Sequence, residues 1–222
     1  MVGRDRPRRG RDLNFPPVLF FKAATGRHTA QHVLPTWWLL TRDGVDADAV
    51  GRAARLRQGE GGVVLRAYGL TWKARLALGQ ELARLCRARR LVLLVAVRNQ
   101  TDLRLAATLH AHGLHLPEGV AGGQILAPLL GWRFQGRRLL TVAAHGPFAL
   151  TRAWRLGADA ALLSPVFPTT SHPDAKPLGP VRFAAWCRKA HLPVVALGGV
   201  RAATMRRLRS SSMSGVATTS SV

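Results

Sequence analysis

The side chains best suited to chemistry lie in a long polar loop over residues 164–180, "SPVFPTTSHPDAKPLGP". Thr169, Thr170, Ser171 and His172 are four consecutive side chains able to donate hydrogen bonds, and Gly179 allows a close approach of the backbone. Because each oxygen of a multiply charged anion accepts several hydrogen bonds, the cluster predicts a phosphate or diphosphate site. The alternative is a capped loop whose hydroxyls satisfy neighbouring backbone groups.

Two further segments carry groups that suit an anion. Gly198 and Gly199 directly follow the apolar run "PVVAL", and glycine lets backbone N–H groups approach a phosphate without interference from Cβ. Ser220 and Ser221 follow the last apolar run and add N–H and hydroxyl donors. The alternative for the glycine pair is a tight turn between a strand and a helix.

Histidines are the candidates for proton transfer. His145 directly follows the apolar run "LLTVAA", where an imidazole that titrates near neutral pH suits an acid or base. The alternative is a histidine that satisfies backbone groups at the end of a strand. His110, His112 and His115 are close in sequence, but their spacing fits neither one helix face nor one strand face, which argues against a metal cluster.

Short apolar runs alternate with helix-sized segments from residue 37 onward. The expected strands are residues 37–41, 62–66, 91–97, 113–116, 139–144, 160–164, 193–197 and, more weakly, 215–219. Helical periodicity is clearest over residues 71–90 and 180–190. Asp46 and Thr71 stand where helix N-caps are expected, and Gly157 stands where a helix should end.

This alternation predicts an α/β fold, a (β/α)8 TIM barrel formed as one domain by residues 35–222. The strands are almost continuously apolar, as expected where both faces of a parallel sheet are buried. The first strand is not followed by Gly-x-Gly-x-x-Gly, which argues against a dinucleotide fold. We expect residues 1–34 to form a basic, weakly ordered extension, or to reflect a start assigned too early, and the last helix to be missing or shortened.

Barrel topology explains why the candidate residues occur where they do. Active sites of TIM barrels lie at the carboxyl ends of the strands, and the loops after the seventh and eighth strands often bind phosphate. The polar loop follows the sixth expected strand, Gly198 the seventh, and Ser220 the eighth. We therefore expect these groups to meet at one end of the barrel.

The charge of the chain is unusually positive, with a formal net charge of +22 over 222 residues. Of the 33 basic residues only Lys22, Lys73, Lys176 and Lys189 are lysines, the pattern that a GC-rich coding bias leaves. The arginines are spread through helical segments without interleaved aromatic residues that would stack bases, so nucleic acid is disfavoured as a partner.

Neither a membrane span nor a disulfide framework is expected. No apolar run approaches the roughly 18 residues needed to cross a bilayer. Cys86 and Cys187 lie in separate helical segments, which indicates two buried free thiols in a reducing, cytoplasmic setting.

Residues 157–200, "GADAALLSPVFPTTSHPDAKPLGPVRFAAWCRKAHLPVVALGGV", resemble the C-terminal half of the thiamine phosphate synthases and their TenI relatives. That family shows Gly-Ala-Asp, a strand, G-P-x-F-P-T-x-T-K, a downstream glycine and I-P-V-V-A-I-G-G-I. The resemblance continues more weakly in "SGVATTSSV", and "WWLLTRD", "GVVLRAY", "LVLLVAVRNQTDLRLA" and "HGLHLPEG" follow the order of the family's first four strands.

The resemblance implies an enzyme of thiamine biosynthesis, a transferase that couples hydroxymethylpyrimidine diphosphate with thiazole phosphate and releases diphosphate. The partner would be a small phosphorylated thiazole or pyrimidine. The implied diphosphate-binding residues are Arg66, Thr169, Ser171 and His172, and the implied phosphate-binding residues are Gly179, Gly198, Gly199, Ser220 and Ser221.

The sequence departs from the family pattern where the family would hold Mg²⁺. The Asn-Asp-Arg after the third strand reads Ala96-Val97-Arg98, and the Gly-Gln-Glu-Asp after the fourth reads "PEGV", so the expected ligand positions hold Val97 and Gly119/Val120, with Glu118 beside them. Two alternatives follow. One is a metal-independent thiazole phosphate tautomerase of TenI type with His145 as the acid or base; the other is a non-catalytic barrel that binds a phosphorylated ligand.

Overall fold

The computed structural model describes residues 34–120, 124–136, 138–169, 174–208 and 211–219. In these ranges eight parallel strands close into a barrel in chain order, and β1 pairs with both β2 and β8. The strands are β1 (Trp37–Leu40), β2 (Gly61–Leu65), β3 (Val92–Ala96), β4 (Gly113–Leu116), β5 (Leu139–Ala144), β6 (Ala160–Leu163), β7 (Val194–Leu197) and β8 (Gly215–Thr218). The predicted α/β barrel is confirmed, with every strand within two residues of its expected ends.

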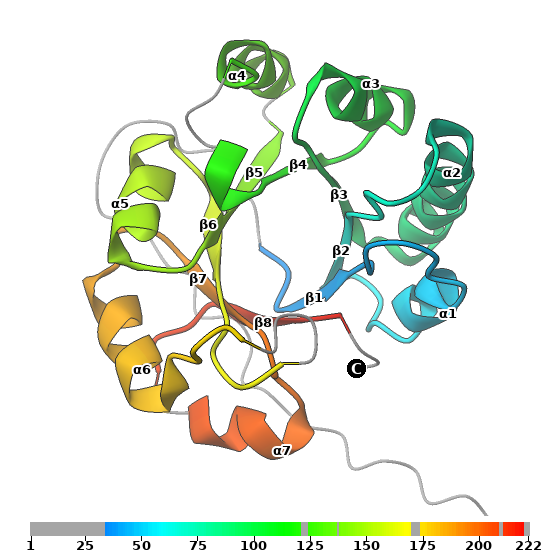
Figure 1. Ribbon diagram of the computed structural model, residues 1–222. Coiled ribbons are helices and arrows are strands. Elements are labelled where there is room, and N and C mark those ends of the chain that lie inside the picture. The colour runs from blue at the N-terminus through cyan, green and yellow to red at the C-terminus, as the bar shows by residue number, and fades with distance from the viewer. Residues whose placement is uncertain (1–33, 121–123, 137, 170–173, 209–210, 220–222) are drawn as a thin grey trace, which may run out of the picture.

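Helices form an outer ring around the strands (Figure 1). They are α1 (Ala49–Ala54), α2 (Trp72–Arg89), α3 (Gln100–Thr108), α4 (Leu126–Gln135), α5 (Pro147–Arg155), α6 (Gly179–Lys189) and the short α7 (Ala202–Met205). Two 3-10 turns, η1 (Glu118–Val120) and η2 (Arg206–Leu208), follow β4 and α7. The expected extension at residues 1–34 lies almost wholly outside the described residues, as do the residues after Thr219.

Alternate residues of each strand face two separate apolar layers. Leu39, Val63 and Leu65 belong to the layer between strands and helices, whereas Trp38 and Val64 belong to the layer that fills the barrel interior. Since successive side chains of a strand point to opposite faces, both faces must be apolar where both are covered. This double burial is why the strands read as continuous apolar runs.

The predicted helix caps are confirmed in part. Thr71 caps α2, because its hydroxyl accepts a hydrogen bond from the N–H of Ala74 at 3.3 Å. Gly157 follows the end of α5 with φ +67°, a conformation that favours glycine.

The assignment of Asp46 as an N-cap was wrong. α1 begins at Ala49 with Asp48 as its N-cap. Asp46 is instead buried, accepts the backbone N–H of Arg42 at 2.8 Å and pairs with the buried guanidinium of Arg52. A charged guanidinium withdrawn from water requires such a partner, and that requirement determines the place of Asp46.

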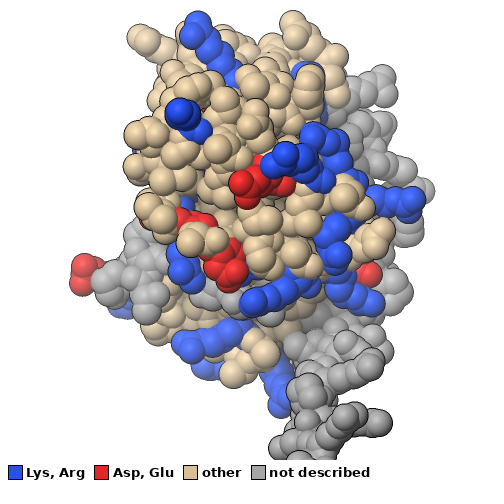
Figure 2. All heavy atoms as spheres, turned by 90° about the vertical axis from the view of Figure 1, so that its right-hand side faces the viewer, with Lys and Arg blue, Asp and Glu red and all other residues tan. Residues whose placement is uncertain are grey.

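Positive charge is dispersed over the face of the barrel that α1 and α2 cover. Figure 2, which faces the side of the barrel covered by α1 and α2, shows Lys and Arg side chains spread over this face with Asp and Glu in only a few small groups.

Cys86 and Cys187 are both buried and unpaired, as predicted, and burial raises the pKa of each thiol to about 12. Among the described residues, the helices are all too short or too polar to cross a membrane.

Candidate active site

The carboxyl ends of the strands gather polar side chains at one end of the barrel. Because the strands are all parallel, Thr41 after β1, Arg66 after β2, Arg98 after β3 and His145 after β5 lie at the same end. This end, termed the barrel mouth below, also carries Glu118 in the turn after β4. Of the candidate residues, Arg66 and His145 therefore lie at this end of the barrel.

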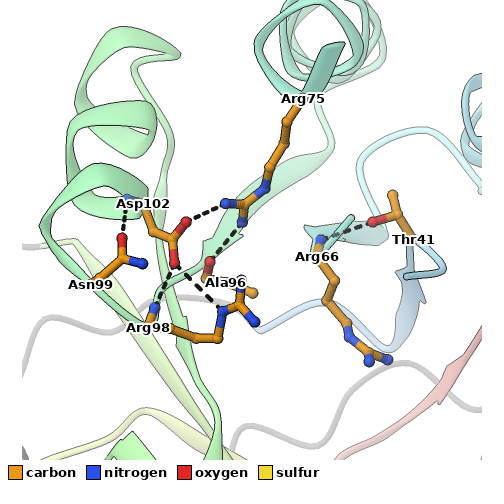
Figure 3. Close-up of polar contacts among 7 residues, drawn as sticks. All are labelled: Thr41, Arg66, Arg75, Ala96, Arg98, Asn99 and Asp102. Carbon is orange, nitrogen blue, oxygen red and sulfur yellow. Dashed lines mark hydrogen bonds and ion pairs between the residues drawn. The ribbon is translucent and has the colours of Figure 1, made fainter. Parts of the chain in front are cut away.

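Arg66, predicted as a diphosphate ligand, is fixed at the mouth through its backbone and its side chain. Its N–H donates to the hydroxyl of the buried Thr41 at 2.8 Å (Figure 3), and its guanidinium pairs with Asp43 at 2.5 Å. The carboxylate of Asp43 is half exposed, with 50% of its side-chain surface accessible. An exposed pair of this kind is weak, so an incoming anion can compete with Asp43 for Arg66.

A buried ion pair holds the loop between β3 and α3. The carboxylate of Asp102 accepts from the guanidinium of Arg75 and, at 2.7 Å, from the N–H of Arg98. Arg75 also donates to the carbonyl of Ala96 at 2.9 Å, and the side chain of Asn99 accepts the N–H of Asp102 at 3.0 Å (Figure 3). These bonds link α2, β3 and α3, and they fix the direction in which the chain leaves β3.

Tyr68 lies among arginines beside this network. The guanidinium carbon of Arg98 lies 3.6 Å from the centre of the Tyr68 ring, and that of Arg75 lies 5.2 Å from it. Burial raises the pKa of Tyr68 to about 12, although the positive charges of Arg66 and Arg98 act in the opposite direction. The phenol therefore stays neutral at physiological pH, and its ring offers an electron-rich face to the Arg98 cation.

His145 and Glu118 form a hydrogen-bonded pair on the other side of the mouth. One carboxylate oxygen of Glu118 accepts from the His145 backbone N–H at 2.8 Å and lies 2.6 Å from its Nδ1. The other oxygen lies 3.5 Å from the guanidinium of Arg152. An Nδ1–H bonded to a carboxylate leaves Nε2 as the ring nitrogen available for proton transfer. The geometry suits the acid–base role predicted for His145.

His115 is a packing residue, in agreement with its position on an expected strand. The ring is buried inside the fold, and its Nδ1 lies 2.9 Å from the hydroxyl of the buried Thr141 on the adjacent strand. Burial lowers the pKa of His115 to about 3, and the nearby positive charge of Arg66 acts in the same direction. The imidazole is therefore neutral wherever the protein is folded near neutral pH.

The neutral burial of His115 predicts a loss of stability in mild acid. In the unfolded chain the ring takes up a proton below its ordinary pKa of 6.5, whereas in the folded chain it does not until about pH 3. The contribution of His115 to the free energy of unfolding is therefore fully present above pH 6.5 and is lost as pH drops below it. This group alone should lower the free energy of unfolding by about 2 kcal/mol between pH 7 and pH 5. Urea unfolding of the wild type and of His115→Asn at pH 7 and pH 5 measures this change in the free energy of unfolding. Equal pH dependence in the two proteins would refute the assignment.

The glycine pair after β7 is required by the loop that follows β6. A Cβ on Gly198 would lie 2.8 Å from the Cα of Pro165, and one on Gly199 would lie 2.4 Å from the carbonyl oxygen of Pro168. Both glycines have positive φ, +89° and +63°. The N–H of Phe167 donates to the carbonyl of Gly198 at 3.0 Å, which joins the two segments. The turn interpretation is confirmed, while phosphate binding by these glycines stays a prediction.

The remaining predicted anion ligands are only partly within the described residues. Gly179 begins α6 with φ +71°, and its N–H donates to the carbonyl of Val166 at 2.9 Å, so contact of this amide with an anion requires that bond to break. Thr169 ends a described range in the loop after β6. Thr170, Ser171, His172, Ser220 and Ser221 lie outside the described residues.

Several residues of the mouth were not singled out from sequence. Tyr68, Arg75 and Asp102 were missed as parts of a site, and Arg98 was noted only as a departure from a pattern. One local signal was present, because Asn99 followed three residues later by Asp102 is a helix N-terminus pattern that places a carboxylate beside the end of β3. The partner of that carboxylate, Arg75, is 27 residues away in sequence and gives no such signal.

The residues at the expected Mg²⁺ positions do not suit the ion. Val97 is completely buried and apolar, and Gly119 and Val120 form part of the turn η1. Mg²⁺ requires oxygen ligands in near-octahedral geometry, usually with one or two carboxylates. Val97, Gly119 and Val120 have no side-chain oxygen to offer.

Three carboxylates of the mouth are engaged by cationic or hydrogen-bonding groups. Asp43 pairs with Arg66, Asp102 pairs with Arg75, and Glu118 holds His145. Across the described ranges, no group of three or more His, Cys, Asp or Glu side chains is arranged to hold a metal ion. The donors that the described residues provide at the mouth therefore do not fit Mg²⁺.

Sequence comparison identifies relatives for most of the chain. A family model described as thiamine monophosphate synthase matches residues 41–222. A putative thiamine-phosphate synthase 2 from Aquifex aeolicus is 33% identical over 145 residues, which are 65% of this chain and 73% of that protein. A thiamine-phosphate synthase from Chloroflexus aurantiacus is 32% identical over 127 residues, 57% of this chain and 56% of that protein.

Structural comparison supports the barrel. A thiamine phosphate pyrophosphorylase from Pyrococcus furiosus superposes with a TM-score of 0.63 at 20% identity, covering 82% of this chain and 84% of that one. A 2-keto-3-deoxy-6-phospho-gluconate aldolase from Zymomonas mobilis superposes with a TM-score of 0.57 at 17% identity, covering 84% and 83%. At these identities the likeness concerns the fold alone.

Proposed function

This chain belongs to the thiamine monophosphate synthase family, and from that membership we propose that it is a thiamine-phosphate synthase. The substrates would be hydroxymethylpyrimidine diphosphate and thiazole phosphate, and the products thiamine phosphate and diphosphate. The observation that carries the proposal is the family match over residues 41–222, which takes in every strand from β2 to β8.

The proposed reaction sets a clear electrostatic task for the protein. The thiazole nitrogen forms a new bond to the methylene carbon attached to the pyrimidine ring, while the bond between that carbon and a diphosphate oxygen breaks and its electron pair stays on diphosphate. Negative charge therefore grows on the leaving group, and fixed donors aimed at it stabilise the transition state. Arg66, at the end of β2, is such a donor, and Thr169 lies in the loop after β6.

The two alternatives raised by the sequence become outcomes of the same assay. A tautomerase would use the paired His145 and Glu118 to move a proton, and a binding protein would hold the ligand without turnover. The relatives reported above are named as synthases, which favours the synthase over both.

The test uses purified full-length protein with both substrates, in the presence and absence of Mg²⁺. We expect thiamine phosphate and diphosphate in equal amounts, and we expect Arg66→Ala to lower kcat/KM about 10- to 100-fold because it removes one charged donor to the leaving group. Arg57→Ala is the matched control, since Arg57 is a surface residue that pairs only at 3.4 Å with Glu60. Absence of product under both metal conditions would contradict the proposal.

A further inference from the structure

The ends of β2 and β3 concentrate positive charge around a single aromatic ring. Arg66 and Tyr68 leave β2, and Arg98 leaves the neighbouring strand β3. The guanidinium carbon of Arg98 lies 3.6 Å from the centre of the Tyr68 ring, and Arg66 is close enough to lower the phenol's pKa against the larger effect of burial. Figure 3 shows Arg66 and Arg98 projecting from these adjacent strand ends.

The nearby carboxylates leave this positive charge incompletely balanced. Asp102 and Arg75 are both buried and bonded to each other, so their charges balance within that pair. Arg98 reaches the same carboxylate only through its Nε at 3.9 Å, beyond hydrogen-bonding distance, and its side chain is 45% exposed. Asp43, the partner of Arg66, is itself half exposed. These strand ends thus present the exposed guanidinium of Arg98 and the partly buried guanidinium of Arg66, whose side chain is 20% exposed and whose carboxylate partner is half exposed.

The position of Arg98 is held although its head group is accessible. Its backbone N–H is bonded to Asp102, and its guanidinium carbon lies over the Tyr68 ring, 3.6 Å from the ring centre. A guanidinium held over an aromatic ring keeps its planar fork of N–H donors, and with 45% of the Arg98 side chain exposed these donors can reach two oxygens of one phosphate. A cation positioned in advance of binding loses little side-chain entropy when the anion arrives.

We propose that Arg98, together with Arg66, binds the diphosphate group of the substrate and supplies the positive charge for its departure without a divalent metal. The proposal rests on the synthase function proposed above, because it concerns the leaving group of that reaction. As the carbon–oxygen bond breaks, the electron pair remains on diphosphate, and the two guanidinium groups donate hydrogen bonds to the oxygens on which charge accumulates. Guanidinium is always protonated and needs no carboxylate ligands, which suits a mouth where Asp43, Asp102 and Glu118 are already engaged.

Binding of inorganic diphosphate tests the site without any turnover. Isothermal titration is carried out on the full-length protein with sodium diphosphate, in about 150 mM salt to screen the general surface charge, with EDTA and then with Mg²⁺. We expect the wild type to bind diphosphate in EDTA. We expect Arg98→Ala to raise the dissociation constant for diphosphate about tenfold. Arg104→Ala, which removes an exposed arginine from α3 six residues further along, should change it less than twofold.

Two further readings separate this proposal from the synthase function. Thermal unfolding followed by circular dichroism shows whether Arg98→Ala is folded, and Arg98→Lys, which keeps the charge but not the planar fork, should recover only part of the binding. Diphosphate binding that requires Mg²⁺ in the wild type, or that is equal in Arg98→Ala and Arg104→Ala, overturns the proposal even if thiamine phosphate is formed. Metal-free binding that depends on Arg98, without any product in the synthase assay, upholds the site and rejects the synthase function.

Discussion

Replacing Asp102 with Ala is expected to lower the free energy of unfolding by about 3–5 kcal/mol. The carboxylate of Asp102 is the charged partner of Arg75, and both side chains are buried, with 4% and 7% of their surface exposed. Removing the carboxylate leaves a guanidinium inside the protein without a counter-charge and also removes the acceptor for the N–H of Arg98. The measurement is urea unfolding at pH 7.

Two controls test whether burial of the pair causes the loss of stability. Glu60→Ala breaks the pair with Arg57, whose side chains are 48% and 68% exposed, and should change stability by less than about 1 kcal/mol. The double variant Asp102→Leu with Arg75→Met replaces the ion pair with apolar groups and should be more stable than Asp102→Ala alone. A loss below about 1 kcal/mol in Asp102→Ala would show that the buried pair does not hold the β3–α3 loop.

Gly199→Ala is expected to destabilise the protein by about 2–5 kcal/mol, the sum of backbone strain and steric overlap. The residue has φ +63°, and a Cβ there would lie 2.4 Å from the carbonyl oxygen of Pro168 and 2.8 Å from the Cβ of Phe167. The loop after β6 must therefore move away from β7. Since that loop carries Thr169, we also expect weaker binding of diphosphate. The free energy of unfolding is measured by urea unfolding of the purified variant, and its affinity for diphosphate by isothermal titration.

A second glycine separates strain from overlap. Gly59 also has positive φ, +77°, but a Cβ there meets nothing within 4 Å. Gly59→Ala should therefore lose only about 1–2 kcal/mol, the cost of the left-handed conformation for a residue with a Cβ. If the two substitutions have equal effects, the contact between the glycine turn and the loop after β6 is not what constrains Gly199.

The barrel was predictable because its determinants are local and repeated. Each strand is a short apolar run followed by a helix-sized segment, and Thr71 and Gly157 mark helix ends through bonds and dihedral angles that involve only near neighbours. Asp46 shows where local reasoning fails. It stood where a cap was expected, yet its buried partner Arg52 determined its place, and sequence spacing carried no sign that this guanidinium would be withdrawn from water.

The site likewise combines features set by local sequence with features set by contacts between residues distant in sequence. The sequence by itself determined that Arg66 and His145 lie at one end of the barrel, because each follows a strand and all the strands are parallel. Only the tertiary structure decided which charges cancel. Glu118 is bound by His145, 27 residues away, and Asp102 by Arg75, also 27 residues away, whereas Arg98 keeps an accessible guanidinium. Ion pairing depends on distance and burial in space, and neither can be read from the spacing of residues along the chain.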